Sequence, residues 1–297
     1  MPLDATLSIG ELAAQAGTTV KTVRFSSDQN LLPEAARSSG GHRRYAPEAL
    51  ARLRTIRSLR SLGVPVSEIR CVLDSGEALE AVVARRLDDL GTELAALRWR
   101  EAALRALQAP EQMAERLELI GAVSVPPSTS VIARYWSRLL PVRLSARLRS
   151  TITEAAVPQP PADPTTDQVL AFAHLHSLAT AATDHCLASH RPITVEHPDL
   201  LYDGLYEAPQ LVDAAVQADR TPGPGEALDC YVAAHARASG TRDTPTFRRA
   251  LTVRLAAAEH PVMTRYWQLA GQLTPDLTLG AADSWFRNAL VASTAAG

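Results

Sequence analysis

Apolar residues recur at helical spacing along most of this chain, beginning close to its first residues. Ser8 and Glu11 have the spacing of a capping box, which predicts that a helix begins at Ile9. We expect this helix to end at Gly17, because glycine readily adopts the left-handed conformation of a helix terminus.

A second short helix is predicted over residues 19–27, with Thr18 as its N-cap and Val20, Val23 and Phe25 facing the first helix. Two short helices joined by a glycine-bearing turn are typical of a helix-turn-helix, whose second helix enters a DNA major groove. Polar residues on its other face are of the types that read groove edges and bind phosphates. These candidate DNA-binding residues are Thr19, Lys21, Thr22 and Arg24.

A basic hairpin is predicted directly after these helices. Residues 37–45 read Arg-Ser-Ser-Gly-Gly-His-Arg-Arg-Tyr, which places a Gly-Gly turn between two short strands. A basic hairpin in this position is typical of a wing that lies along the sugar-phosphate backbone. The side chains that we expect to hold the backbone are Arg37, His42, Arg43 and Tyr45.

A third helix is predicted over residues 47–62, and a short fourth helix over residues 66–73. The arginines of the third helix, between positions 52 and 60, either form a solvated face or contact DNA phosphates. Its apolar positions recur every three residues, and we expect them to be buried: Leu50, Leu53, Ile56, Leu59 and Leu62.

A long helix over residues 77–107 carries apolar residues at alternating spacings of four and three, a coiled-coil pattern that is broken only at Glu101. Burying one leucine contributes on the order of 2 kcal/mol, so pairing with a second copy of the chain is favoured. The alternative is that the stripe packs on the chain's own C-terminal domain. The predicted dimerisation residues are Val83, Leu87, Leu90, Leu94, Leu97 and Leu104.

The order of these motifs resembles the winged helix-turn-helix of MerR-type transcription regulators. The resemblance covers about residues 7–107 and includes Leu-Leu-Pro at 31–33, the Gly-Gly-His-Arg-Arg-Tyr wing and Ser-Leu-Gly-Val-Pro at 61–65. It implies a homodimer with antiparallel long helices and two heads on double-stranded promoter DNA. It also implies that a bound signal lets the dimer bend and untwist the promoter so that RNA polymerase engages it.

Two positions depart from the pattern of this family. Phe25 is followed by Ser26 where the family usually has a second aromatic residue, and a tyrosine there would contact a phosphate. We expect the Ser26 hydroxyl to replace that contact only in part. Asn30 stands where the family usually has glycine, and asparagine tolerates the left-handed conformation that the turn needs.

The rest of the chain reads as helices, and no alternation typical of strands appears beyond residue 50. The predicted fold is mostly α, with an N-terminal winged helix-turn-helix over 1–75, a long dimerisation coiled-coil helix over 76–109 and a C-terminal all-helical domain over 110–297. The helical patterns of that last domain lie at about 130–155, 167–190, 199–219, 225–239, 244–258, 260–273 and 280–294.

Most aromatic residues lie in the C-terminal domain, where the resemblance implies a sensor. Tyrosine and tryptophan combine an apolar body with a polar tip, which suits a pocket for a bulky hydrophobic small molecule. Ordinary core packing is the alternative, and the sequence leaves both open. The candidate ligand-binding residues are Tyr135, Trp136, Tyr202, Tyr206, Tyr266 and Trp267.

Composition narrows the function further. Residues 1–75 hold ten Lys and Arg against seven Asp and Glu, whereas the whole chain has 30 and 32, so a basic head precedes an acidic body. Cys71, Cys186 and Cys230 are far apart and odd in number, which favours a reduced, cytoplasmic protein without disulfides. The chain shows no signal peptide and no apolar run long enough for a membrane span.

No cofactor, metal site or catalytic centre is predicted. His174, His176, His185 and His190 share one predicted helix with Cys186, but only the Cys186 and His190 pair has a spacing suited to one metal ion. Motifs of metalloproteases, serine hydrolases and phosphate-binding loops are absent from the sequence. The sequence therefore favours a DNA-binding protein over an enzyme.

Three functions agree with these observations. The first is a homodimeric transcription regulator that distorts promoter DNA in response to a ligand bound by the helical domain. The second is a constitutive DNA-binding regulator whose helical domain recruits a protein partner. The third is a protein that sequesters a toxic compound such as an antibiotic and regulates its own supply.

Overall fold

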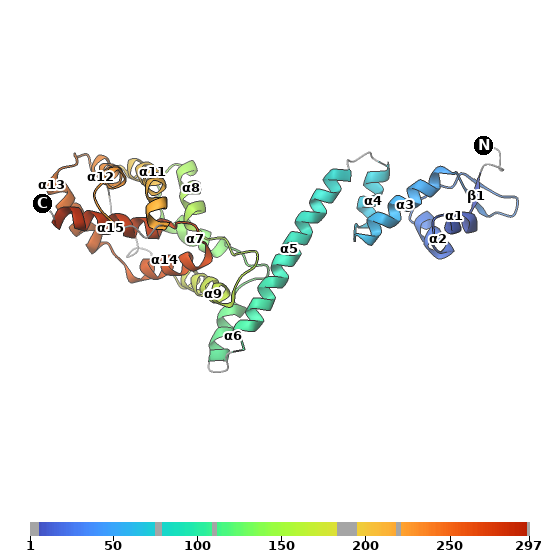
Figure 1. The fold of residues 1–297 in the computed structure, drawn as a ribbon, viewed down its shortest axis with the longest axis horizontal. Coiled ribbons are helices and arrows are strands. Elements are labelled where there is room, and N and C mark those ends of the chain that lie inside the picture. The colour runs from blue at the N-terminus through green and yellow to red at the C-terminus, as the bar shows by residue number, and fades with distance from the viewer. Residues whose placement is uncertain (1–5, 75–78, 109–111, 183–194, 218–220, 296–297) are drawn as a thin grey trace. The chain divides into compact units, whose positions relative to one another are not determined.

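A computed structural model describes residues 6–74, 79–108, 112–182, 195–217 and 221–295 of the chain. The chain divides into two compact units, residues 1–93 and residues 94–297 (Figure 1). The division falls inside one long helix, α5 (Leu79–Ala106). Helices dominate both units, which confirms the predicted fold class. The domain boundaries after residues 75 and 109 stay predictions.

The first unit builds four short helices and a small sheet before α5. The sheet is antiparallel with the order β1-β3-β2, and it places Leu7 opposite Tyr45 and Ala36 opposite Arg44. In chain order, the elements are β1 (Leu7–Ser8), α1 (Ile9–Gln15), α2 (Val20–Asp28), β2 (Ala36–Arg37), β3 (Arg43–Tyr45), α3 (Glu48–Ser61) and α4 (Val66–Asp74).

Local capping explains where α1 and α2 begin. The Ser8 hydroxyl accepts a hydrogen bond from the Glu11 amide at 3.2 Å, and the Glu11 carboxylate accepts one from the Ser8 amide at 2.7 Å, so the predicted capping box is confirmed. Gly17 ends the turn after α1 with a φ of 62°. The prediction of Thr18 as the next N-cap is wrong by one residue, because it is the Thr19 hydroxyl that accepts a hydrogen bond from the Thr22 amide in the first turn of α2.

The core of the first unit joins α1, α2, α3 and α4 around Leu12, Leu53 and Ile69. Only Val23 of the three apolar α2 residues expected to face α1 is buried, since Val20 and Phe25 are 39% and 48% exposed. The buried face of α2 consists of Val23 and two small polar residues, Ser26 and Ser27, at the i+3 and i+4 positions.

The predicted stripe of α3 is confirmed at its centre and wrong at its end. Leu53, Ile56 and Leu59 are buried and Leu50 is partly buried, whereas Leu62 is exposed. Leu62 lies outside the stripe because it is the C-cap of α3, and Gly63, at a φ of 77°, turns the chain there toward α4.

The regular elements of the second unit are all helices in the residues that the structure describes. The predicted single helix over 130–155 is wrong, because the chain breaks at Pro141 and forms two helices. After the end of α5, the elements are α6 (Met113–Gly121), α7 (Ser130–Leu139), α8 (Ala146–Ala156), α9 (Thr166–Ala181), α11 (Pro198–Gln217), α12 (Glu226–Ala238), α13 (Pro245–Ala257), α14 (Pro261–Leu273) and α15 (Leu279–Ala295).

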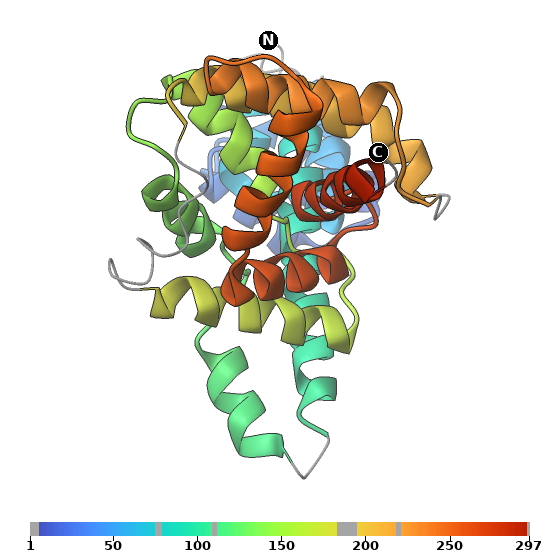
Figure 2. The same cartoon turned by 90° about the vertical axis from the view of Figure 1, so that its left-hand side faces the viewer.

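Two hydrophobic cores support the second unit. One joins α5, α7, α9 and α14, where Trp99 of α5 meets Phe172 of α9 edge-on with ring centroids 5.4 Å apart. The other joins α11, α12, α13 and α15, where Tyr231 stacks on Phe286 at 4.6 Å. Figure 2 shows α9 running beside α14 in the lower part of this unit. A cleft lies between the two cores.

Candidate functional site

The outer face of α2 presents basic and aromatic side chains to solvent. Lys21, Arg24 and Phe25 are all exposed, and neither cation forms an ion pair with another described residue. Thr19 and Thr22 lie on the same helix, but their hydroxyls bond to each other at 3.0 Å as part of the N-cap. Lys21 and Arg24 are therefore the α2 side chains most available to a phosphate or a base edge.

The wing is a tight hairpin whose arginines are held by carboxylates. The Gly41 amide donates to the Ser38 carbonyl at 2.8 Å and closes the turn. Arg43 forms ion pairs of 2.6 Å with both Asp28 and Glu34, and Glu34 also pairs with Arg37 at 3.2 Å. A phosphate that reaches this hairpin must therefore compete with carboxylates that are already in place.

His42 lies at the outer end of the wing hairpin and is exposed. Its backbone amide donates to the Ser38 hydroxyl at 3.2 Å, which helps to hold the hairpin turn. Among the four side chains proposed for the wing, His42 and Arg37 are the two exposed ones.

Two sequence-based expectations for the DNA surface are corrected by burial. Tyr45 was expected to hold the DNA backbone, but it is completely buried and its hydroxyl shares a 2.7 Å hydrogen bond with Ser27. Ser26 was expected to replace part of a phosphate contact, but it is buried and its hydroxyl donates to the Thr22 carbonyl at 3.0 Å. Both hydroxyls stabilise the helix-turn-helix from inside.

Three arginines of α3 hold the helix-turn-helix together. Arg52 donates to the Leu31 carbonyl at 2.6 Å, Arg54 donates to a carbonyl at the end of α1 at 3.3 Å, and Arg57 donates to the Ala16 carbonyl. These bonds satisfy backbone oxygens that a helix end or turn leaves open. Three of the four α3 arginines therefore serve the fold, which neither of the two sequence-based alternatives anticipated, whereas Arg60 is exposed.

The predicted dimerisation stripe of α5 is exposed along its whole length. Its six apolar side chains are between 39% and 68% exposed, whereas Val82 and Trp99 on other faces of α5 are buried in the cores of the first and second units. An apolar stripe of this regularity rarely stays in water on an isolated chain. The stripe consists of Val83, Leu87, Leu90, Leu94, Leu97 and Leu104.

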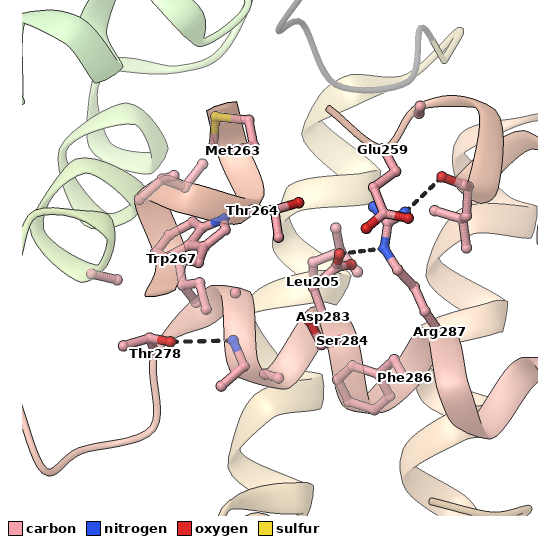
Figure 3. A pocket seen from close by; sticks show the side chains of 18 of the residues that line it. Leu205, Glu259, Met263, Thr264, Trp267, Thr278, Asp283, Ser284, Phe286 and Arg287 are labelled. Carbon is pink, nitrogen blue, oxygen red and sulfur yellow. Dashed lines mark hydrogen bonds and ion pairs between the residues drawn. The ribbon is translucent and has the colours of Figure 1, made fainter. Parts of the chain in front are cut away.

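A cleft of about 610 Å³ lies between the two cores of the second unit. Figure 3 shows Trp267 and Met263 of α14 on one side and Asp283, Phe286 and Arg287 of α15 on the other. Most of the wall is apolar and aromatic, and the volume is in the range of sites for drug-sized molecules.

The aromatic residues predicted for a pocket divide between its wall and the core. Trp136, Tyr202 and Trp267 line the cleft. Tyr135 and Tyr266 do not line it and belong to the core, where the Tyr266 hydroxyl donates to the Ala156 carbonyl at 2.6 Å and accepts from the Trp136 indole at 2.7 Å. The side chain of Tyr206 lies outside the described residues.

A close approach between α14 and α15 fixes Trp267 in the cleft wall. A Cβ atom at Gly280 would lie 2.0 Å from the Cγ atom of Trp267, so only glycine allows the indole to rest on α15. Gly271 also lines the cleft, but a Cβ atom there would meet nothing within 4 Å.

A polar group at the floor of the cleft was not predicted from the sequence. Asp283 accepts a hydrogen bond from the Tyr231 hydroxyl at 2.9 Å and pairs with the Arg287 guanidinium at 2.5 Å. Arg287 also donates to the Leu255 carbonyl at 2.6 Å. The spacing of Asp283 and Arg287, four residues apart on a helix, is an ion-pair signal that the sequence did carry.

His235 is the second missed residue of the cleft. It is 3% exposed, lines the cleft and has no hydrogen-bond partner at either ring nitrogen. Burial lowers the pKa of its imidazole to about 4, aided by the nearby charges of Arg254 and Arg287 and opposed by Asp283. The ring is therefore neutral near pH 7, with one donor nitrogen and one acceptor nitrogen.

Neither a metal centre nor a membrane span is found in the described parts of the chain. No three His, Cys, Asp or Glu side chains there are grouped closely enough to hold a metal ion. Residues 183–194, with His185, Cys186 and His190, lie outside the described residues. None of the helices in these parts combines the length and hydropathy needed to cross a bilayer.

Comparison with known proteins places the N-terminal region in a family. Residues 7–76 match the model of the MerR HTH family regulatory proteins. The chain is 37% identical over 87 residues to the nodulation protein NolA of Bradyrhizobium sp. (strain NC92), which covers 29% of this chain and 37% of that protein. It is 40% identical over 83 residues to the HTH-type transcriptional activator TipA of Streptomyces coelicolor, covering 28% and 33%.

A shorter relative matches over most of its own length. The HTH-type transcriptional regulator ZntR homolog of Haemophilus influenzae is 35% identical over 109 residues, which cover 33% of this chain and 81% of that protein. Relative to NolA and TipA, the chain spans only about a third of their length. The helix-turn-helix geometry, the wing and these matches together show that the chain belongs to the MerR family of helix-turn-helix regulatory proteins.

Proposed function

We propose that this chain is a homodimeric transcription regulator that binds double-stranded promoter DNA and responds to a small molecule. The observation that carries the proposal is the outer face of α2, where Lys21 and Arg24 are exposed without ion pairs among the described residues. Membership of the MerR family supports the same use of this helix. Phosphate contacts from such cations supply most of the affinity of a DNA-binding protein.

Dimerisation follows from the exposed stripe of α5. Burial of its leucines contributes on the order of 2 kcal/mol each, which offsets the entropic cost of association. The rival prediction, that the stripe packs on the chain's own C-terminal domain, has no support because all six side chains are exposed in one chain. Two paired copies present two helix-turn-helix units, which suits a near-palindromic site.

The response to a signal is assigned to the cleft of the second unit. Trp99 lies in the core beside this cleft, while Leu97 and Leu104 face outward on the same helix. A ligand that changes the packing around Trp99 therefore acts on the helix that carries the dimer stripe. Through that helix, the dimer distorts promoter DNA and aids RNA polymerase, as the family resemblance implies. A cleft of this kind favours a small-molecule signal over recruitment of a protein partner.

The DNA proposal is tested by an Arg24→Ala variant in fluorescence-anisotropy titrations with the chain's own upstream DNA. We expect affinity to fall about tenfold and the slope of log K against log salt to decrease in magnitude by about one unit, because one phosphate contact is lost. Arg147→Ala is the matched control, since Arg147 is exposed on α8 in the second unit. Equal behaviour of the two variants contradicts the assignment of α2.

The dimer is tested in the same titrations with Leu90→Asp. A charge within the stripe should convert the chain to a monomer in analytical ultracentrifugation and reduce affinity for a two-half-site DNA by more than tenfold. Val142→Asp is the control, because Val142 is more exposed than any residue of the stripe but lies outside it. A Leu90→Asp variant that remains dimeric contradicts the proposed interface.

A further inference from the structure

The chemical character of the cleft goes beyond its size. Its wall contains the large rings of Trp136, Trp267 and Phe286, and Tyr231 lies behind with its ring stacked on Phe286. Trp136 and Trp267 lie 5.4 Å apart between ring centroids, at a tilt of 47°. Ring faces held at these distances favour a ligand that has aromatic rings of its own.

The charges at the floor of the cleft are already balanced. Both carboxylate oxygens of Asp283 have donors, one from Tyr231 and one from Arg287. Glu259 also lines the cleft, but it is exposed and therefore screened by water. A charged ligand group would lose hydration at this floor, and Glu259, the one lining charge without an ion pair among the described residues, is screened by water, so the cleft disfavours ions.

The unsatisfied group at the cleft is His235. Its nitrogens are covered and unpartnered, although most buried polar groups in proteins have a hydrogen-bond partner. A neutral imidazole offers one N–H donor and one acceptor nitrogen. A ligand hydroxyl, carbonyl or N–H that reaches this ring, after a modest rotation of the imidazole, supplies the missing partner.

We infer that the cleft binds an uncharged aromatic molecule that presents a hydrogen-bonding group to His235. The inference rests on the proposed function, because this molecule is the class of signal to which the regulator responds. It adds His235 as the residue that distinguishes polar from purely hydrocarbon ligands, and the Asp283–Arg287 pair as the feature that selects against charge.

The test uses two fluorescent probes with the same ring skeleton and the full chain. N-phenyl-1-naphthylamine is uncharged and has one N–H, and 8-anilinonaphthalene-1-sulfonate adds a sulfonate to that skeleton. In fluorescence titrations, we expect the uncharged probe to bind at least tenfold more tightly. Thr264 is exposed and lies between Trp267 and Glu259 in the cleft lining (Figure 3), so Thr264→Trp should fill the rim and abolish the binding of the uncharged probe.

The role of His235 is tested with His235→Phe, which keeps a ring but removes both nitrogens. We expect the affinity for N-phenyl-1-naphthylamine to fall about fivefold, the usual effect of one lost hydrogen bond. His176→Phe is the matched control, because His176 lies on α9 and does not line the cleft. Its affinity should equal that of the wild type.

A folding defect in His235→Phe would leave the test intact, because a ligand change can replace the mutation. 1-Benzylnaphthalene has a CH₂ group in place of the N–H. In competition titrations, its dissociation constant should be about fivefold higher than that of N-phenyl-1-naphthylamine. Equal competition, tighter binding of the sulfonate probe, or unchanged affinity in a folded His235→Phe variant overturns the inference.

The outcome is separable from that of the proposed function. Selective probe binding without any effect on DNA affinity overturns the proposed signal response and leaves the ligand class standing. Normal DNA binding without selective probe binding overturns the ligand class and leaves the DNA-binding regulator standing.

Discussion

Two buried polar side chains, one in each unit, differ in whether they have a hydrogen-bond partner. Tyr45 of the first unit is fully buried, and its hydroxyl is paired with Ser27 at 2.7 Å. His235 of the second unit is also buried, at 3% exposed, but neither ring nitrogen has a hydrogen-bond partner. The first arrangement closes a core, whereas the second borders a cleft of about 610 Å³.

This difference indicates what each unit is built to do. A closed, satisfied core holds α2 and the wing in a fixed geometry, which a surface that meets DNA requires. An unsatisfied buried group beside an open cleft is a cost that a ligand can remove. The two units therefore have different sensitivities to pH, to loss of a hydroxyl and to local helix stability.

The largest expected effect is the pH dependence of the second unit. The folded pKa of His235 is about 4, below the unfolded value of about 6.5, so the unfolded chain takes up a proton first as pH falls. The free energy of unfolding should therefore fall by about 3 kcal/mol between pH 6.5 and pH 4 from this residue alone. Urea denaturation at several pH values measures it.

Tryptophan fluorescence makes this measurement specific, because all four tryptophans belong to the second unit. His235→Phe is the comparison, since other groups titrate in both proteins and cancel in the difference. If the wild type loses no more unfolding free energy than His235→Phe between pH 6.5 and pH 4, His235 does not cause the pH dependence. The tryptophans are Trp99, Trp136, Trp267 and Trp285.

The next effect is the removal of one hydroxyl in the first unit. Tyr45→Phe should reduce the free energy of unfolding of that unit by about 1 kcal/mol, because the Ser27 hydroxyl is left buried without a partner. Ser27→Ala in the Tyr45→Phe background should then cost little more. Urea denaturation followed by circular dichroism gives the double-mutant cycle, and additive losses would show that the two hydroxyls do not interact.

The smallest effect tests whether the units unfold independently. Gly10 on α1 and Gly271 on α14 are both exposed helical positions where a Cβ atom would meet nothing within 4 Å. Replacement of either by alanine should stabilise its own unit by about 0.5 kcal/mol through helix propensity. Only Gly271→Ala should shift the transition seen by tryptophan fluorescence. A shift of that transition by Gly10→Ala would show that the two units unfold together as one cooperative unit.

Local signals made the first unit predictable. The capping box at Ser8, the turn at Gly17 and the left-handed Asn30 depend on neighbours within four residues, and the structure has all three. Which side of α2 faces the core depends on how that helix packs. The burial of Ser26 and Tyr45, which withdraws both hydroxyls from the DNA surface, was therefore not visible in the spacing.

The cleft was only partly predictable for a related reason. Trp136 and Trp267 were named from composition, and they line it. The polar floor joins Tyr231 of α12 to Asp283 of α15, 52 positions apart, and only the packing of distant helices brings them together. Periodicity reports which face of a helix is apolar, but it does not report which other helix that face meets.

The wing carries its own counter-ions. A duplex that docks against Arg43 must displace Asp28 and Glu34, which leaves two carboxylates facing the incoming polyanion. We therefore expect little net gain in affinity from that exchange on DNA of arbitrary sequence, which keeps non-specific binding weak. On the proposed DNA surface, a site whose shape also engages Lys21 and Arg24 should recover the loss, so we expect discrimination between sites before any base is read.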